Sequence, residues 1–281
     1  LVTLNGFDAD RATRIRLVEP ADARHGELWE QLLSGTYERP IMVEDGRRRS
    51  LCFSIDGSVQ SEMSLADPTE LVNAYTREMM AFLLFCPRPT DIVLVGLGGG
   101  SLAKFCHRHL PRTRLTAVEI DPAVIALRRH FRVPPDDERL RVVEGDGGEF
   151  VAAMAAAGRR TDVLLVDAYD RHGMARSVCE RPFLEDACRV LSDDGVLVTN
   201  LAMYESRRDA YLRQLRSVCG EPVLAVDVGW GGNTVAFAGP AVRSRRRLVA
   251  AAHYARCVEA RLNLTYTRLS DLVEHQLQRM R

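Results

Sequence analysis

From Ile92 onward, short apolar runs alternate with segments in which apolar residues recur every three or four positions. This alternation predicts β-strands separated by amphipathic helices. The expected strands are 92–96, 114–119, 140–144, 162–167 and 195–200. The expected helices are 100–110, 122–131, 147–157, 181–191 and 207–218. Strands that alternate with helices of this length indicate βαβ units and a parallel sheet.

The last two expected strands, 222–228 and 233–239, are separated by a short glycine-rich turn that contains Trp230. Because the connection is too short for a crossover, we expect this pair to be antiparallel. A parallel sheet that ends in an antiparallel hairpin is typical of Rossmann-like folds of the class I methyltransferase type. The sequence therefore predicts an α/β protein of this class, in which Trp230 lines the mouth of a site or packs against the sheet.

The residues before this sheet predict a small β-rich domain made of hairpins. Asp45-Gly46 and Asp56-Gly57 are two-residue turns of the kind that joins antiparallel strands. The expected elements are a helix at 27–33, strands at 39–45, 50–55 and 58–63, and a helix at 71–85. The expected domains are 1–68 (β-rich), 69–240 (Rossmann-like and nucleoside-binding) and 241–281 (a tail of two helices).

Composition excludes several classes of partner. The formal net charge is +0, so the balance of charges does not favour a nucleic acid or a membrane surface. The arginine runs 47–49 and 243–247 lack interleaved aromatic residues and are interpreted as solvated faces. No apolar stretch reaches the ~18 residues of a membrane span, and the first residues do not resemble a signal peptide. The 7 cysteines include no C-x-x-C pair, which predicts reduced, mostly buried thiols in a cytoplasmic protein.

Four successive expected strands end in a glycine turn or a carboxylate. The glycines after the first strand are Gly96, Gly98, Gly99 and Gly100. Because the carboxyl ends of parallel strands meet at one edge of the sheet, these residues predict a nucleoside site there. A dinucleotide fingerprint would need glycine at position 101, where the chain has Ser101, so a nicotinamide-dependent oxidoreductase is disfavoured.

The acids that end the next strands suggest separate tasks. Glu119 can accept hydrogen bonds from two ribose hydroxyls. Asp146 can accept from an adenine amino group beside Gly147, or it can cap the following helix. Asp167 and Asp170 can take a proton from an attacking amine or hold a cationic substrate, unless one of them caps a turn.

A metal site is not expected. His107 and His109 are two positions apart on an expected helix, so their side chains diverge. The cysteines show no ligand spacing.

Together these segments resemble the polyamine aminopropyltransferase (spermidine synthase) family, over roughly residues 35–240. The likeness is carried by VLVGLGGGSLAKF, TAVEIDPAVIALRRHF, RVVEGDGGEFV, DVLLVDAYD and DDGVLVTNL. The resemblance implies a small N-terminal β-domain on a Rossmann-like domain, and a homodimer. It also implies that an aminopropyl group passes from decarboxylated S-adenosylmethionine to a small-molecule amine, leaving methylthioadenosine.

The resemblance assigns expected roles to single residues. Glu119 would bind the ribose, and Asp146 with Gly147 the adenine. Asp167 would deprotonate the attacking amine. Asp170 and Tyr75 would line the amine site, although a core position for Tyr75 remains open because it lies on the apolar face of its helix.

The departures from the family pattern cluster at the end of the site where the cofactor tail meets the acceptor. Gly99 stands where the family's glycine loop has an aspartate that holds the ammonium of the tail. Tyr75 is followed by Thr76 and Arg77, and Asp170 by Arg171 instead of proline. Loss of the acid weakens binding of the decarboxylated cofactor and admits ordinary S-adenosylmethionine, whose tail carries a carboxylate. An S-adenosylmethionine-dependent methyltransferase and a catalytically degenerate nucleoside-binding protein therefore remain alternatives.

Overall fold

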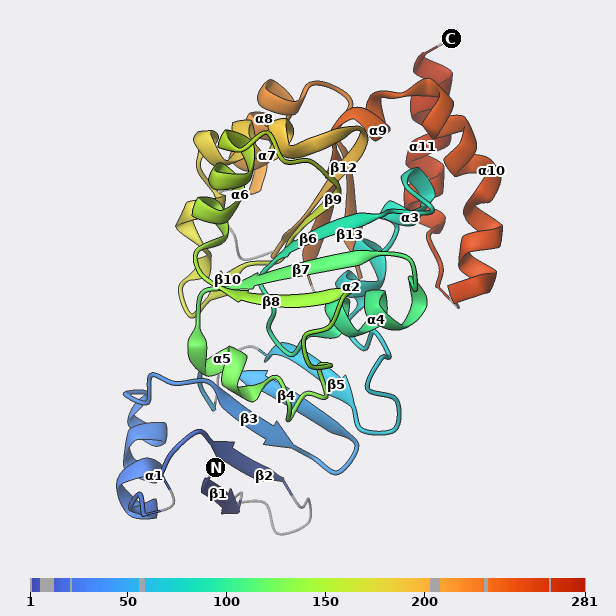
Figure 1. Ribbon diagram of the computed structural model, residues 1–281. Helices are drawn as coiled ribbons and strands as arrows, with labels where there is room; N and C mark the ends of the chain where they lie inside the picture. Colours follow the sequence, from blue (N-terminus) through green and yellow to red (C-terminus); the bar gives the residue numbers. More distant parts are fainter. Residues whose placement is uncertain are drawn as a thin grey trace.

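The computed structural model describes residues 2–5, 13–20, 22–55, 59–202, 208–229, 232–262 and 264–280. It contains a five-stranded sheet in the order β1-β2-β3-β4-β5 and a seven-stranded sheet in the order β13-β14-β12-β9-β6-β7-β8 (Figure 1). The last strand of the smaller sheet contacts the helix that follows the first strand of the larger sheet, where the hydroxyl of Ser101 donates to the backbone oxygen of Glu62. The predicted Asp56-Gly57 turn and Trp230 fall outside the described residues.

The larger sheet has the predicted Rossmann-like organisation. Its strands are β6 (Asp91–Val95), β7 (Arg114–Glu119), β8 (Leu140–Glu144), β9 (Thr161–Val166), β12 (Leu191–Leu201), β13 (Leu224–Val228) and β14 (Asn233–Ala238). Strands β8, β7, β6, β9 and β12 are parallel, whereas β14 pairs antiparallel with both β12 and β13. The strand order reverses between β6 and β9, and such a switch point is where open α/β sheets bind ligands.

Helices cover both faces of this sheet (Figure 1). One face is covered by α6 (Gly147–Ala156), α7 (Arg181–Val190) and α8 (Arg208–Cys219). The other is covered by α2 (Ala74–Met79), α3 (Phe82–Phe85), α4 (Ser101–His109), α10 (Arg245–Leu262) and α11 (Thr267–Arg279). Along β6, Val93 and Val95 pack into the first layer and Ile92 and Leu94 into the second. Both faces are apolar because both are buried, which explains why the strands are nearly continuous apolar runs.

The expected helix at 71–85 is wrong, because the chain forms the two helices α2 and α3 instead. Between them the amides of Met80 and Ala81 bond to carbonyls three residues back, which tightens the turn. All residues from Met79 to Phe85 are buried. When every side of a segment is apolar, periodicity does not reveal where a helix breaks.

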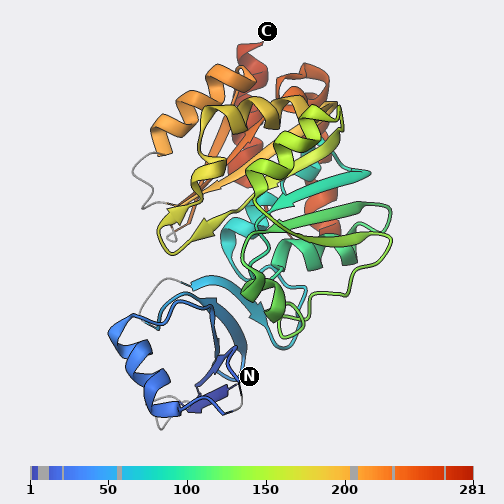
Figure 2. The same ribbon diagram turned by 60° about the vertical axis from the view of Figure 1, so that its left-hand side comes forward.

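The smaller sheet is an antiparallel meander. Its strands are β1 (Val2–Asn5), β2 (Arg14–Leu17), β3 (Ile41–Glu44), β4 (Arg48–Cys52) and β5 (Val59–Ser64). Helix α1 (His25–Ser34) lies beside this sheet (Figure 2). Its residues Leu28 and Leu32 are buried in the same apolar cluster as Leu17 and Ile41 of the sheet. Strands β1 and β2 were not expected, since four-residue strands give little periodicity.

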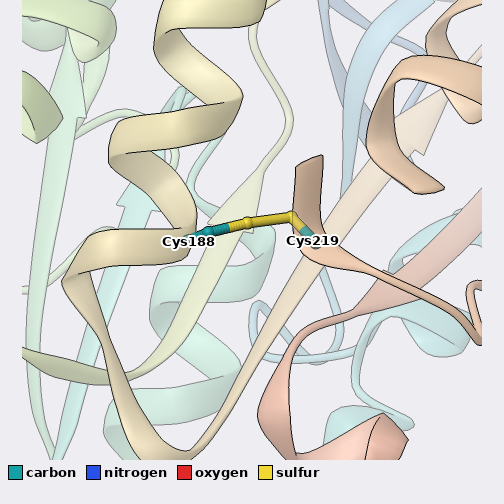
Figure 3. The surroundings of a disulfide bond; sticks show 2 residues. All are labelled: Cys188 and Cys219. Atoms are coloured by element: carbon teal, nitrogen blue, oxygen red, sulfur yellow. A yellow bond between two sulfur atoms is a disulfide. The ribbon is translucent and has the colours of Figure 1, made fainter. Parts of the chain in front are cut away.

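The expectation that all cysteines are reduced is wrong for one pair. Cys188 on α7 and Cys219 at the end of α8 form a disulfide, with Cα atoms 5.9 Å apart (Figure 3). The two cysteines are 31 residues apart in sequence, and only the packing of α7 against α8 brings them together. Cys52 and Cys106 are buried thiols, as expected.

The C-terminal tail contains α9 (Pro240–Arg243) in addition to the two expected helices, α10 and α11. Several side chains of the arginine runs are engaged within the molecule. Arg246 and Arg247 pair with Asp194, and Arg49 pairs with Glu44. Among the helices of the described chain, none has the length and apolar character needed to cross a bilayer.

Candidate active site

A cavity of about 510 Å³ lies at the carboxyl ends of β6, β7 and β9, the edge that the sequence predicted. Leu51, Phe53 and Ser61 of the smaller sheet region close it from the opposite side. Its volume is within the range of small-molecule and cofactor sites. The cavity therefore needs both sheets.

In the turn after β6, backbone conformation and nearby atoms require glycine at two positions. Gly96 has φ +92°, and a Cβ there would lie 2.1 Å from the carbonyl oxygen of Asp167. Gly100 has φ +69°, and its Cβ would lie 2.3 Å from Cγ2 of Val133. No side chain fits at either position, so both glycines are required by backbone conformation and close approach. Gly96 and Gly98 line the cavity, whereas Gly99 and Gly100, which the sequence also placed at the cofactor, are not among its lining residues.

Gly99 is placed differently from its neighbours. A Cβ at this position would lie 2.7 Å from Oγ of Ser61 and 2.9 Å from Cδ1 of Phe131. Of these residues, Ser61 lines the cavity. A side chain at 99 would thus have to move the side chains of Ser61, on β5, and of Phe131, which follows α5.

Glu119 ends β7 and is 8% exposed. Its Oε2 accepts hydrogen bonds from the backbone amides of Leu97 (2.8 Å) and Gly98 (3.4 Å). Its Oε1 accepts from the amide of Asp121 at 3.0 Å. The carboxylate is therefore held against the glycine turn, inside the cavity wall.

The next residue, Ile120, was missed by the sequence interpretation. It is a large apolar side chain that lines the cavity and is 61% exposed. Val178 lines the same cavity and is buried. The sequence did contain a signal for Ile120, because it is an apolar residue between Glu119 and Asp121 at the end of a strand.

Asp146 performs the capping role that the sequence left as an alternative. It is the N-cap of α6, and its Oδ1 accepts from the amide of Glu149 at 3.0 Å. It is also half-buried in the cavity wall. At Gly147 a Cβ would lie 2.1 Å from Cγ1 of Val95, so glycine lets α6 begin directly against β6.

Asp167 follows β9 at the switch point and lines the cavity. Its Oδ1 accepts from Nδ2 of Asn200 at 2.8 Å, and it also accepts a hydrogen bond from the hydroxyl of Tyr75. Burial raises the pKa of the Asp167 carboxyl above its usual value and the charge of Glu119 adds to this, while the two hydrogen bonds oppose the shift. Burial and the nearby Asp167 raise the pKa of Tyr75 well above its usual value, so its hydroxyl stays protonated and donates.

Asn200, Asn233 and Tyr169 complete this part of the site and were not found from the sequence. Nδ2 of Asn233 donates to Oδ1 of Asn200 at 2.8 Å. The hydroxyl of Tyr169 donates to the backbone oxygen of Asn200 at 2.9 Å and accepts from the amide of Ala202 at 2.8 Å. Acids at successive strand ends form a recognisable pattern, whereas amides at strand ends give no comparable pattern.

Asp170 lies at the exposed mouth of the cavity, in the short hairpin of β10 (Tyr169–Asp170) and β11 (Gly173–Met174). Its Oδ1 accepts from the amide of His172 at 2.6 Å. The neighbouring Arg171 donates to the backbone oxygen of Glu38, in the segment before β3. Asp170 thus shapes a turn while it lines the cavity.

The residues after Tyr75 serve the local backbone. The hydroxyl of Thr76 donates to the oxygen of Asn73 at 2.6 Å, and Thr76 lines the cavity. Nη1 of Arg77 donates to the oxygens of Leu71 and Val72. Within the part of the chain that the structure describes, no three histidine, cysteine or acidic side chains form a group that could hold a metal ion.

Fold and cavity together define a Rossmann-like α/β protein with a cofactor-sized site at its switch point, bordered by a buried acid on the second strand. The family follows from comparison of sequences. The spermine/spermidine synthase domain matches residues 72–219, and the chain belongs to this family.

The chain is similar to polyamine aminopropyltransferases of bacteria and, over a shorter stretch, to a mammalian methyltransferase. A polyamine aminopropyltransferase from Neisseria meningitidis is 40% identical over 197 residues, covering 69% of this chain and 73% of that protein. One from Chromobacterium violaceum is 36% identical over 196 residues, covering 69% of this chain and 74% of that protein. An eEF1A lysine and N-terminal methyltransferase from Mus musculus is 31% identical over 142 residues, covering 48% of this chain and 20% of that protein.

Solved structures support the fold. A spermidine synthase in complex with the transition-state analogue AdoDATO has a TM-score of 0.58 at 18% identity, covering 72% of this chain and 71% of that chain. Human methyltransferase-like protein 13 in complex with SAH has a TM-score of 0.60 at 23% identity, covering 69% of this chain and 94% of that chain.

Proposed function

We propose that the protein is an aminopropyltransferase-like enzyme that binds an adenosyl sulfonium in the cavity and alkylates an amine. Asp167 is the proposed base. The observation that carries this proposal is that Asp167, with its raised pKa, lines the same cavity as the buried acid Glu119. Relatives named polyamine aminopropyltransferase make decarboxylated S-adenosylmethionine the first candidate for the aminopropyl donor.

The nucleoside half of the proposed complex uses residues on β6, β7 and α6. Glu119 already accepts three backbone hydrogen bonds, and a carboxylate has about four acceptor sites, which leaves about one site for a ribose hydroxyl unless the long bond from Gly98 gives way. Ile120 and Val178 offer apolar surfaces for the adenine ring, and burial of Ile120 there would be favourable. Asp146 with Gly147 would meet the edge of the adenine, and Gly96 and Gly98 let the backbone approach.

The proposed chemistry is a displacement at carbon. The lone pair of the acceptor nitrogen attacks the carbon next to sulfur, the carbon–sulfur bond breaks and its electron pair stays on sulfur. The nitrogen loses one proton, which Asp167 takes. Since the positive sulfur is a good leaving group, the protein mainly has to position the reactants and accept that proton.

The acceptor end of the cavity carries mixed charges. Asp167 and Asp170 lie there together with Arg171 and His172. A cationic side chain beside Asp170 disfavours a long polyamine that carries several charges. We therefore propose an acceptor with at most one positive charge besides its reacting amine.

Methyl transfer from S-adenosylmethionine is the second candidate. The specific observation in its favour is Gly99, where no acid repels the carboxylate of that cofactor's tail. The partial likeness to methyltransferases agrees with it. A buried ammonium without an acid partner costs on the order of several kcal/mol, so the two donors should differ measurably in affinity.

One experiment separates the candidates. The purified protein is incubated with each sulfonium and a panel of monoamines, diamines and amino acids, and products are identified by mass spectrometry. Methylthioadenosine supports aminopropyl transfer, and S-adenosylhomocysteine supports methyl transfer. If neither appears with any acceptor while the nucleosides bind, the protein is a nucleoside-binding protein without catalysis.

Assembly and location are part of the same proposal. The homodimer and the cytoplasmic location expected from the sequence stay predictions. Light scattering of the purified chain tests the first, and fractionation of the source cells tests the second.

A further inference from the structure

Three side chains form a directed line of hydrogen bonds that ends at Asp167. Asn233, the first residue of β14, donates to Asn200 near the end of β12 at 2.8 Å. Asn200 in turn donates to Asp167 at 2.8 Å. The line joins the antiparallel hairpin at the end of the sheet to the switch point.

The direction of this line follows from the chemistry of its members. An ionised carboxylate can only accept hydrogen bonds, so the amide group nearest Asp167 must be the NH2 of Asn200. The carbonyl of Asn200 then faces away from Asp167 and needs a donor. Asn233 supplies that donor through its own NH2.

The backbone around Asn200 is fixed independently. Tyr169 binds the main-chain oxygen of Asn200 and the amide of Ala202, and Asn200 pairs with Val235 in the sheet. Asn200 is 3% exposed and borders the cavity, so only water inside the cavity could take the place of a missing partner. With the backbone fixed in this way, only the orientation of the side-chain amide of Asn200 can vary. Asn233 is the residue that donates to the carbonyl oxygen of this amide.

We propose that Asn233 is a positioning residue that keeps the NH2 of Asn200 facing Asp167. This inference rests on the proposed function, in which Asp167 accepts the proton of the amine. If Asn200 turned over, its carbonyl oxygen would face the carboxylate and would disfavour the ionised form that catalysis needs.

The groups that influence the ionisation of Asp167 come from four elements. Tyr75 on α2 and Asn200 on β12 donate hydrogen bonds, and Glu119 on β7 adds a negative charge. Tyr169, which follows β9, acts on Tyr75. A neutral change at Asn233 leaves all of these residues in place and alters the orientation of one amide, whereas Asn233→Asp also adds a negative charge that by itself raises the pKa of Asp167.

The decisive variant is Asn233→Asp. Its carboxylate attracts the NH2 of Asn200, so Asn200 turns its carbonyl toward Asp167. Loss of a hydrogen bond to a charged group predicts a fall in kcat/KM of about ten- to hundredfold, and the acidic limb of the pH profile moves to higher pH. Asn233→Ala should give a smaller change in the same direction, because it only releases the amide.

Two controls make the test specific. Thr234→Val removes the hydrogen bond from Thr234 to Asp227 on the same hairpin and should leave the pH profile unchanged. In an Asn200→Ala background, Asn233→Asp should have a clearly smaller effect, because only the direct repulsion between the new charge and Asp167 is left. Equal effects in both backgrounds would overturn the proposal.

A measurement without turnover separates this inference from the proposed function. The carboxyl of Asp167 is titrated by NMR in protein saturated with S-adenosylhomocysteine, and its signal is assigned with Asp167→Asn. A titration moved to higher pH by Asn233→Asp, and moved less by the same change in the Asn200→Ala background, supports the positioning role even if no acceptor reacts. An unmoved titration overturns it, whether or not the enzyme turns over.

Discussion

At the scale of single residues, opposing effects hold Asp167 in a reactive state. Burial and Glu119 favour its protonated form, whereas hydrogen bonds from Tyr75 and Asn200 favour the carboxylate. A base near neutrality needs such a balance, because it must be ionised before the reaction and must hold a proton afterwards. The sequence predicted Glu119 and Tyr75 as site residues but not their contact with Asp167, and it did not reveal Asn200, because none of these neighbours is within the D-x-x-D segment.

Asp167→Asn tests the role of this acid. The amide cannot take a proton, so we expect turnover to fall by about 10²-fold or more. Binding of S-adenosylhomocysteine or methylthioadenosine, measured by calorimetry, should change little. Equal losses in turnover and nucleoside binding would make Asp167 a binding residue.

Glu78 on α2 gives a prediction for the dependence of stability on pH. Burial raises the pKa of its carboxyl from 4.5 to about 7, and its Oε1 is buried without a hydrogen-bond partner among the described residues. The folded state therefore holds a proton that the unfolded state has lost between these pH values. Stability is accordingly lost as the pH rises through this window.

Glu78→Gln removes that ionisation. At pH 8 the variant should unfold with a free energy up to about 3 kcal/mol higher than that of the parent, and at pH 4 the difference should be close to zero. Urea denaturation at the two pH values measures it. A difference that does not depend on pH would show that the ionisation of Glu78 is not responsible.

At the scale of secondary-structure elements, the sequence predicted the central strands and their order of connection well. Asp121 caps α5 (Pro122–Leu127) by accepting from the amide of Ala123 at 2.8 Å, and a local cap of this kind can be recognised before Pro122. The break between α2 and α3 could not be predicted, since it depends on burial from all sides. The Cys188–Cys219 pair and the Asn233–Asn200 contact depend on which elements become neighbours in space.

The start of α6 provides a prediction about packing. Gly147→Ala would place a methyl group into Val95, so we expect a loss of about 1–3 kcal/mol in stability and weaker nucleoside binding. Gly26→Ala on α1 is the matched control, because a Cβ there meets nothing within 4 Å. That change should stabilise by roughly 0.5–1 kcal/mol. Chemical denaturation and thermal shift with nucleoside measure both.

At the scale of the whole molecule, the disulfide ties α7 to α8 on one face of the large sheet. The enclosed loop spans 31 residues, for which the chain-entropy model predicts about 3–4 kcal/mol of stabilisation. Adding a reductant should lower the melting temperature of the parent, whereas the Cys188→Ser, Cys219→Ser double variant should not respond. Equal responses of the two proteins would mean that another effect of the reductant is measured.

The contact between Gly96 and the carbonyl of Asp167 has a consequence for redesign of the donor preference. The glycine turn proposed to bind the cofactor contacts, at Gly96, the backbone of Asp167, the proposed base. A larger residue at position 96 would therefore also displace Asp167. At Gly99, by contrast, a new side chain would meet only the side chains of Ser61 and Phe131. An acid introduced at position 99 together with a smaller residue at 131 should therefore increase the preference of this scaffold for the decarboxylated donor over S-adenosylmethionine.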